Sequence, residues 1–249
     1  MSLAPGLTED RLLDGQVVLR QARDGYRAGM DAVLLAAALD ARPGEHLVEF
    51  GCGAGGALLC AAVRLPEVTL TGHEKDEAAA ALARDNVRLN GLDARVRVET
   101  SDIAALGSGH GADQVFFNPP FFDDPASLRA PRPEKRAAWI SDGAPLGTWV
   151  QAAARSLRAK GRLTLIHRAD RLGDILHALD KSFGSVAIKP VHPRAGQPAK
   201  RVIVTARIGG RAPLVLLDPL VMHEGVSHSA TAELLLRGRS AIAMDPNVT

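Results

Sequence analysis

A short apolar segment that runs into a cluster of glycines is the feature that most restricts the fold of this chain. His46–Phe50 is predicted to be a buried strand, and the glycine-rich loop Gly51–Gly56 follows it directly. An Ala- and Leu-rich helix is expected after the loop, to about Arg64. Glycines permit unusual φ angles and let a ligand approach the backbone, and a helix N-terminus favours polar or anionic ligand groups. We therefore expect a strand–loop–helix unit that holds a ligand at its loop.

Predicted strands and helices alternate along the rest of the chain. Further strands are expected at Val68–Glu74, Arg95–Glu99, Ala112–Phe117, Arg162–His167, Val186–Lys189 and Arg201–Arg207, and helices at Met30–Leu39, Glu77–Leu89, Leu146–Arg158 and Leu172–Leu179. Residues 190–200 are expected to form a basic loop, and the tail from Pro213 an apolar run and a short helix at Ala232–Leu236. This alternation indicates a Rossmann-like α/β fold with a mostly parallel sheet covered by helices on both faces.

Composition limits the classes of function. With 249 residues, 46% of them hydrophobic, the chain is long enough for one large domain or one domain with a decoration. The net charge of +2 permits a nucleic-acid partner without arguing for one. Cys52 and Cys60 provide neither a disulfide framework nor the spacing of a metal site. No signal peptide and no apolar run long enough to span a bilayer is visible, so a cytoplasmic location is expected.

A strand that ends in an asparagine and two prolines is the second informative feature. Ala112–Phe117 is followed by Asn118, Pro119, Pro120 and the aromatic Phe121. The prolines bar helix or ladder continuation, so Asn118 is expected on a rigid loop at a strand's carboxyl end, where α/β sheets bind ligands. The Asn118 amide oxygen and the Pro119 carbonyl can accept the two hydrogens of a planar NH2 group while Phe121 stacks on its plane. Taken alone, Asn-Pro-Pro is also a common turn.

Glu74, the acid that ends the strand predicted after the glycine loop, indicates a ribose-binding site. Glu74 lies about 20 residues beyond the glycines, the spacing of a carboxylate that hydrogen-bonds a ribose hydroxyl pair. Gly51, Gly53 and Gly56 also satisfy the dinucleotide pattern G-x-G-x-x-G. Two features argue against NAD: Glu49 stands two residues before the first of these glycines, and Asn-Pro-Pro-Phe has no obvious use in hydride transfer.

The acid-x-Gly-x-Gly arrangement resembles the first motif of the class I S-adenosylmethionine-dependent methyltransferases, and the later Asn-Pro-Pro-Phe resembles those that methylate exocyclic amines. This resemblance implies S-adenosylmethionine as cofactor and a mostly parallel seven-stranded methyltransferase domain over residues 29–249, after an N-terminal extension at residues 1–28. It implies cofactor contacts at Glu49, Gly51, Cys52, Gly53, Gly55, Glu74, Asp102 and Asn118, and methyl transfer at Asn118, Pro119, Pro120 and Phe121. Asp102 would meet the adenine amino group of the cofactor, and it can also cap the following helical turn.

Three further stretches resemble a narrower group. They are residues 25–35, residues 86–92, and the region from 198–202 to 222–225. They are similar to the bacterial tRNA (adenine) methyltransferase family that modifies the 6-amino group of an anticodon-loop adenine in a valine tRNA, and the likeness covers nearly the whole chain. It implies a tRNA partner. Phe121 stands where this family has tyrosine, and Ser227–Ser229 where a Tyr-Thr pair is expected, which bears on the substrate more than on the reaction.

Basic residues near these motifs are candidates for contacts with RNA phosphates. They are Arg129, Arg132, Lys135 and Arg136 in the proline-containing loop of residues 123–139, and Arg194, Lys200 and Arg201 further along the chain. The loop fits either a lid over the substrate or solvated surface. Tyr26, the only tyrosine, fits a packing role or a substrate-facing one.

Other functions fit the same motifs. A protein glutamine-amide methyltransferase would present the same planar NH2 group, and a small-molecule O- or N-methyltransferase would use the same cofactor motifs. A binding protein with a vestigial cofactor fold and an NAD enzyme are the remaining alternatives. We expect the transfer of methyl to an adenine amine in tRNA ahead of these.

Overall fold

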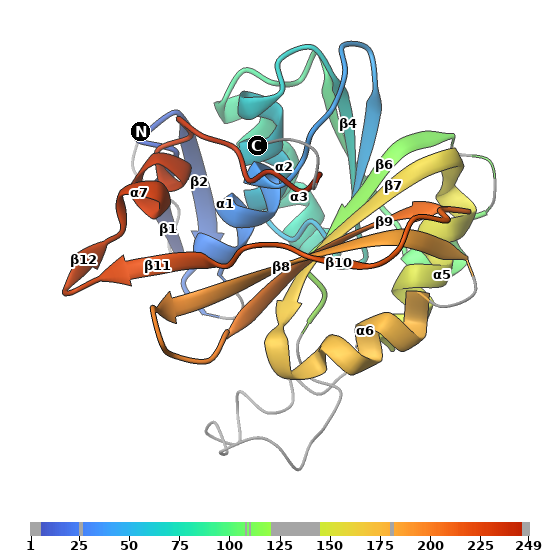
Figure 1. The fold of residues 1–249 in the computed structure, drawn as a ribbon. Helices are drawn as coiled ribbons and strands as arrows, with labels where there is room; N and C mark the ends of the chain where they lie inside the picture. Colours follow the sequence, from blue (N-terminus) through green and yellow to red (C-terminus); the bar gives the residue numbers. More distant parts are fainter. Residues whose placement is uncertain are drawn as a thin grey trace, which may run out of the picture.

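The computed structural model describes residues 6–24, 27–107, 109, 111–120, 145–179 and 182–245 (Figure 1). Phe121, Tyr26 and the basic residues of the 123–139 loop lie outside these ranges. The described residues form one large twisted sheet with helices on both sides, and a separate two-stranded hairpin at the N-terminal end.

Most elements lie where the sequence predicts them. The main-sheet strands are β3 (His46–Phe50), β4 (Thr69–Glu74), β5 (Val96–Thr100), β6 (Ala112–Phe117), β7 (Leu157–Arg168), β8 (Phe183–Arg194), β9 (Arg201–Ile208), β10 (Val215–Leu216), β11 (Leu220–Glu224) and β12 (Ser227–His228). The helices are α1 (Met30–Ala37), α2 (Gly56–Arg64), α3 (Glu77–Leu89), α5 (Leu146–Ser156), α6 (Leu172–Leu179) and α7 (Ala230–Leu236), with short 3-10 turns at Ile103–Ala105 and Ala169–Arg171.

The order of the strands follows the expected fold and extends it. The seven predicted strands lie side by side as β5-β4-β3-β6-β7-β9-β8, and only β9 runs antiparallel to its neighbours among them. Beyond β8 the sheet continues through β11 and β12, and β10 also pairs with β8, which gives ten strands in the described part of the chain. The expected number of seven strands is therefore too low. The tail was predicted only as an apolar run with a short helix, but it contains three more strands of two to five residues each.

Strand β8 corrects a second expectation. Residues 190–194 belong to β8 and not to a basic loop, so only residues 195–200 connect β8 to β9. Proline interrupts a sheet because it has no N–H for the ladder. Pro190 pairs with Val202 of β9, while on its other side it falls between the positions that pair with β10 and those that pair with β11. The sheet therefore accommodates this proline where no second partner strand requires its N–H.

Two hydrophobic clusters flank the sheet. One contains buried residues of α1, α2 and α7 together with the hairpin, and the other is built around α5 and α6. Alternate residues of β3 enter the two clusters, Leu47 the first and Val48 the second. The helices therefore cover both faces, as the alternation of elements predicted.

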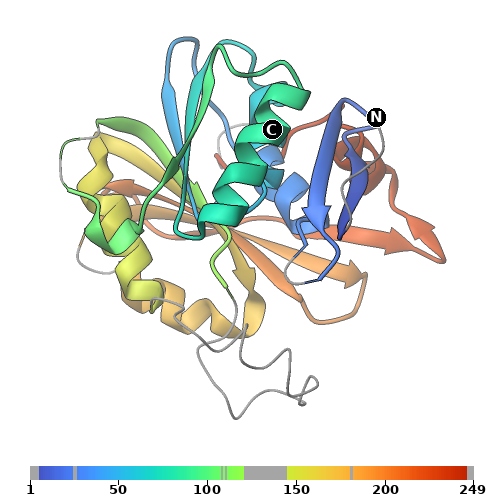
Figure 2. The same cartoon turned by 180° about the vertical axis from the view of Figure 1, so that it is seen from behind.

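The N-terminal hairpin packs into this core. It consists of β1 (Leu7–Leu12) and β2 (Val17–Ala22), where the sequence indicated only one extended piece, and it lies beside α3 when the molecule is seen from behind (Figure 2). Asn90 anchors β2 through both backbone groups of Val18, accepting from its N–H at 2.9 Å and donating to its carbonyl at 2.8 Å. The hairpin is thus fixed to the helix that follows the second sheet strand.

Candidate active site

The strand register gathers the predicted site at one edge of the sheet. Phe50, the last residue of β3, pairs with Phe117 of β6 on one side and with His73 of β4 on the other. These strands are parallel, so the residues that follow them meet at the carboxyl edge, where ligands bind in open α/β sheets. Neighbouring strands lie about 4.8 Å apart. Gly51 and Asn118 therefore directly follow adjacent strands, β3 and β6, and Glu74 at the end of β4 lies on the other side of the glycines.

The glycine loop adopts the conformations for which glycine is needed. Gly51, Gly53 and Gly55 have φ angles of 60°, 53° and 91°, in the left-handed region. A Cβ added to Gly51 would lie 2.6 Å from the Trp149 ring, whereas one added to Gly53 would meet nothing within 4 Å. The loop thus rests on Trp149 at its start, and its backbone is open on the side of Gly53.

Glu74 is fastened to this loop. Its carboxylate accepts a hydrogen bond of 2.8 Å from the Gly53 N–H and one of 3.0 Å from the Asp76 N–H. Each carboxylate oxygen has a second lone pair, so the group can accept further hydrogen bonds while it stays oriented. The arrangement suits the hydroxyl pair of a ribose beside the glycine loop.

Asp102 lies one strand further along the same edge. It follows β5, and its Oδ1 accepts a hydrogen bond of 2.8 Å from the Ala104 N–H at the start of the 3-10 turn. The capping role considered from the sequence is therefore confirmed. The second role, a contact with the adenine amino group of the cofactor, stays a prediction.

Glu49 is a buried acid on the face of the sheet that packs against α1 and α2. It is 3% exposed, and its Oε2 has no hydrogen-bond partner among the described residues. Burial, together with the nearby Glu74 carboxylate, raises the pKa of Glu49 from its usual 4.5 to about 8, although a hydrogen bond from the Leu58 backbone acts in the opposite direction. Such a carboxylate favours a cationic partner, because a positive charge would stabilise its ionised form.

The Asn-Pro-Pro segment follows β6 as predicted. Asn118 is half-buried with its Oδ1 shielded from solvent, Pro119 is buried and Pro120 is exposed. Beneath this edge Phe117 stacks on Phe50 at a centroid distance of 6.3 Å and packs at 5.4 Å against Trp149. An aromatic layer therefore supports both the glycine loop and the start of the Asn-Pro-Pro segment.

Three of the candidate phosphate contacts lie in the described residues. Arg194 ends β8 and Lys200 and Arg201 lie at the start of β9, at the same carboxyl edge as the cofactor motifs. Arg194 donates from Nε to the Gly225 carbonyl at 3.3 Å. Arg201 donates from Nε to Asp31 at 2.9 Å and from Nη1 to the Lys200 carbonyl at 3.1 Å. The other candidates for phosphate contacts, Arg129, Arg132, Lys135 and Arg136, lie outside the described residues, as do Tyr26 and Phe121.

The structure adds two residues for which no role at the site was predicted. Trp149, in the helix predicted at Leu146–Arg158, is buried with its ring under Gly51. Asn86, fully buried, donates to the Ala54 carbonyl in the glycine loop at 2.9 Å and also bonds both backbone groups of Arg20 in β2. A polar residue on the buried face of a predicted helix is the signal that could have identified Asn86.

Comparisons with known proteins agree with this geometry. The Methyltransferase small domain family matches residues 28–131. A protein of Porphyromonas gingivalis named tRNA1(Val) (adenine(37)-N6)-methyltransferase is 30% identical over 216 residues, which cover 81% of this chain and 83% of that one. The chain therefore belongs to the same methyltransferase family as this relative. A protein of the same name from Bacteroides thetaiotaomicron is 27% identical over 72% of this chain and 76% of its own length.

Solved structures give the same family of folds. A predicted O-methyltransferase from Agrobacterium tumefaciens is 28% identical, with a TM-score of 0.72 over 85% of this chain and 98% of that one. An S-adenosylmethionine-dependent O-methyltransferase from Thermotoga maritima, at 17% identity, has a TM-score of 0.55 over 76% of this chain and 69% of that one, and it shows the fold alone. The chain is an S-adenosylmethionine-dependent N-methyltransferase of class I fold.

The residues present fit this cofactor. The buried Glu49 carboxylate, with one oxygen lacking a hydrogen bond, suits the ammonium group of its amino-acid part. The oriented Glu74 carboxylate suits its ribose hydroxyls, and the open backbone at Gly53 leaves room beside them.

The described residues contain no group of three or more His, Cys, Asp or Glu side chains placed to hold a metal. Among the helices that the structure describes, none has both the length and the hydropathy of a membrane span. Both cysteines are free and buried.

Proposed function

We propose that this methyltransferase transfers the methyl group of S-adenosylmethionine to the 6-amino group of an adenine in tRNA. The observation that supports the proposal is the register of β3 and β6, which are neighbouring parallel strands, so that Asn118 directly after β6 and the glycine loop directly after β3 lie at the same edge of the sheet. Relatives named tRNA1(Val) (adenine(37)-N6)-methyltransferase support the choice of adenine and of tRNA.

Positioning is the main task of the protein in this proposal. An adenine amine is a poor nucleophile because its lone pair is delocalised into the ring. Asn118 Oδ1 and the Pro119 carbonyl accept its two hydrogens, which favours a pyramidal nitrogen whose lone pair points toward the methyl group. S-adenosylmethionine, held by Glu49, the glycine loop, Glu74 and Asp102, supplies that electrophilic methyl group when bound. No strong base is required, since the nitrogen can lose its proton to water after the transfer.

The RNA is held by stacking and by charge. Phe121 stacks on the adenine, which is worth about 1–3 kcal/mol per base. The target adenine must unstack from the neighbouring bases to reach the site. A base in an RNA loop is already partly unstacked, which lowers this cost. The cationic residues at the carboxyl edge, Arg194 and Lys200 among them, contact phosphates.

The decisive test uses the nucleosides of tRNA. The purified protein is incubated with labelled S-adenosylmethionine in three separate reactions. One contains unmodified tRNA, one a protein extract and one a small-molecule extract. Label in N6-methyladenosine, identified by mass spectrometry of digested tRNA, supports the proposal. Label in a protein glutamine, or in a small molecule with none in RNA, would overturn it in favour of the corresponding alternative.

A further inference from the structure

Residues 27–31, called the strap from here on, connect the N-terminal hairpin to the first turn of α1. The side chain of Gln21, in β2 and only 3% exposed, holds both backbone groups of Ala28. Its Oε1 accepts from the Ala28 N–H at 2.7 Å, and its Nε2 donates to the Ala28 carbonyl at 3.1 Å. Arg27 adds contacts of 2.6 Å to Thr8 and to Asp10 in β1. The first part of the strap is therefore fixed to the hairpin.

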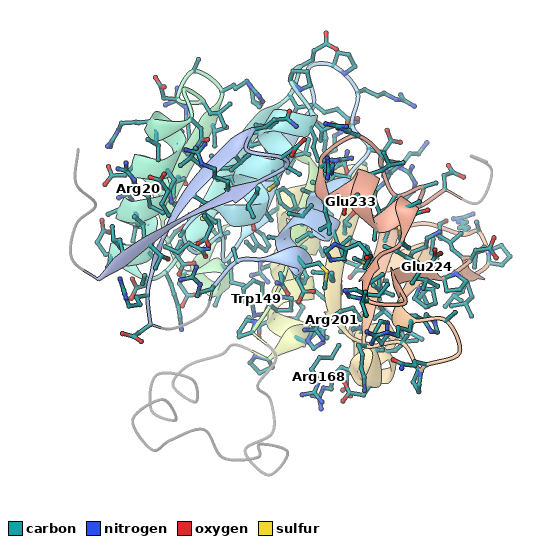
Figure 3. The ribbon with its side chains drawn as sticks, turned by 90° about the vertical axis from the view of Figure 1, so that its left-hand side faces the viewer. Arg20, Trp149, Arg168, Arg201, Glu224 and Glu233 are labelled. Carbon is teal, nitrogen blue, oxygen red and sulfur yellow. The ribbon has the colours of Figure 1, made fainter. Side chains whose placement is uncertain are left out.

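The other end of the strap is fixed to the main sheet. Asp31, in the first turn of α1, forms an ion pair of 2.9 Å with Arg201, the first residue of β9. The Asp31 side chain is 17% exposed and that of Arg201 is 31% exposed, so water screens the pair only in part. The negative charge of Asp31 near the N-terminus of α1 is also favourable to the helix. Figure 3 shows Arg201 and Arg168 toward the same end of the molecule as Trp149.

The strap lies against the beginning of α2. A Cβ added to Gly56, the first residue of α2, would be 2.4 Å from the Ala28 Cβ, so the two backbones approach as closely as a glycine permits. Gly56 is the point at which the glycine loop passes into α2, directly after Gly55. Glu49 points to the same face of the sheet as Leu47, which packs in the cluster of α1 and α2. The strap thus lies against the start of α2, on the face of the sheet to which Glu49 points.

We propose that Asp31 and Arg201 are positioning residues that act through the strap on cofactor binding. Their ion pair keeps the start of α1 packed against α2. This packing closes the cofactor site on the side of Glu49, so that the bound cofactor cannot leave there. Loss of the ion pair detaches the strap from β9 at Asp31. S-adenosylhomocysteine, which the cofactor becomes after methyl transfer, then dissociates faster and binds more weakly. The inference concerns cofactor retention, so it holds whether the methyl acceptor is RNA or another amine.

The test measures binding of S-adenosylhomocysteine by calorimetry, without any RNA, to the wild-type chain and to Asp31→Asn and Arg201→Met. Both variants are expected to bind it about tenfold more weakly, as for loss of one partly buried ion pair. Arg168→Met is the matched control, because Arg168 pairs with Arg201 in the β7–β9 register but forms its ion pair with the nearby Asp170. The control is expected to bind like wild type. Thermal unfolding of each variant establishes that it is folded.

Two further measurements separate this role from a direct RNA contact. The exchange Asp31→Arg with Arg201→Asp restores an ion pair, so it is expected to recover part of the affinity that each single change loses. A phosphate contact would instead give Arg201→Met unchanged affinity for S-adenosylhomocysteine and a smaller salt dependence of RNA binding. That result, or equal losses in the Arg168→Met control, would overturn the inference. Failure of the tRNA assay would not, since no RNA is present in the binding measurements.

Discussion

The ring of Trp149 lies directly under Gly51, so that a Cβ added to this glycine would be 2.6 Å from the Trp149 Cη2 atom. The contact joins α5 to the loop after β3, two elements that lie about a hundred residues apart in the chain. Gly51 also has a φ of 60°, which is costly for any residue with a Cβ. The glycine is therefore required twice, by its backbone angle and by the indole that supports it.

Gly51→Ala is expected to lower both stability and cofactor affinity, by about tenfold or more in the dissociation constant of S-adenosylhomocysteine. Gly44→Ala is the matched control, because Gly44 also has a positive φ, of 82°, but no atom within 4 Å of an added Cβ. The control isolates the backbone strain. Trp149→Phe in the Gly51→Ala background should recover part of the loss by making room. Equal unfolding free energies for Gly51→Ala and Gly44→Ala would show that the indole contact contributes nothing.

Asn118→Ala is expected to abolish methyl transfer and to leave cofactor binding nearly intact. The asparagine carries one of the two acceptors that orient the amine. It is only one of the cofactor contacts that the resemblance implies, and the change leaves Glu49, Glu74 and Asp102 at the ends of β3, β4 and β5 in place. Single-turnover rates with tRNA and calorimetry with S-adenosylhomocysteine check the two parts separately. Turnover near the wild-type rate would remove Asn118 from the mechanism.

Glu49 is expected to make the stability of the cofactor-free protein depend on pH. Its pKa is raised from 4.5 to about 8, so between these values the folded protein keeps a proton that the unfolded chain has lost. The contribution of this group is full below about pH 4.5 and declines as the pH rises toward about 8, because the unfolded state then binds fewer protons. Glu49→Gln should flatten this decline in urea unfolding across that range. Parallel slopes for the two proteins would mean that Glu49 is ionised in the folded state.

Asn86→Ala is expected to destabilise the protein by about 3 kcal/mol, because it leaves buried backbone groups of β2 and of the glycine loop without partners. Asn90→Ala is the matched comparison, since Asn90 anchors the hairpin through Val18 but does not bond the loop. Denaturant unfolding should show a loss for both variants. Cofactor affinity should fall for Asn86→Ala alone, and an equal fall for Asn90→Ala would assign the effect to the hairpin as a whole.

The sequence alone determined the local features of this protein. Short-range signals were sufficient for the strands before and after the glycine loop, for α3 at Glu77–Leu89, and for the end of β6 before Asn118. These depend on glycine and proline backbone limits and on apolar periodicity, which neighbouring residues carry. The tertiary structure alone decided what lies beside them: Trp149 under Gly51, Asn86 between the hairpin and the loop, and Asp31 against Arg201. Such contacts join distant segments through the packing of helices on the sheet, and no local pattern specifies a partner across that distance.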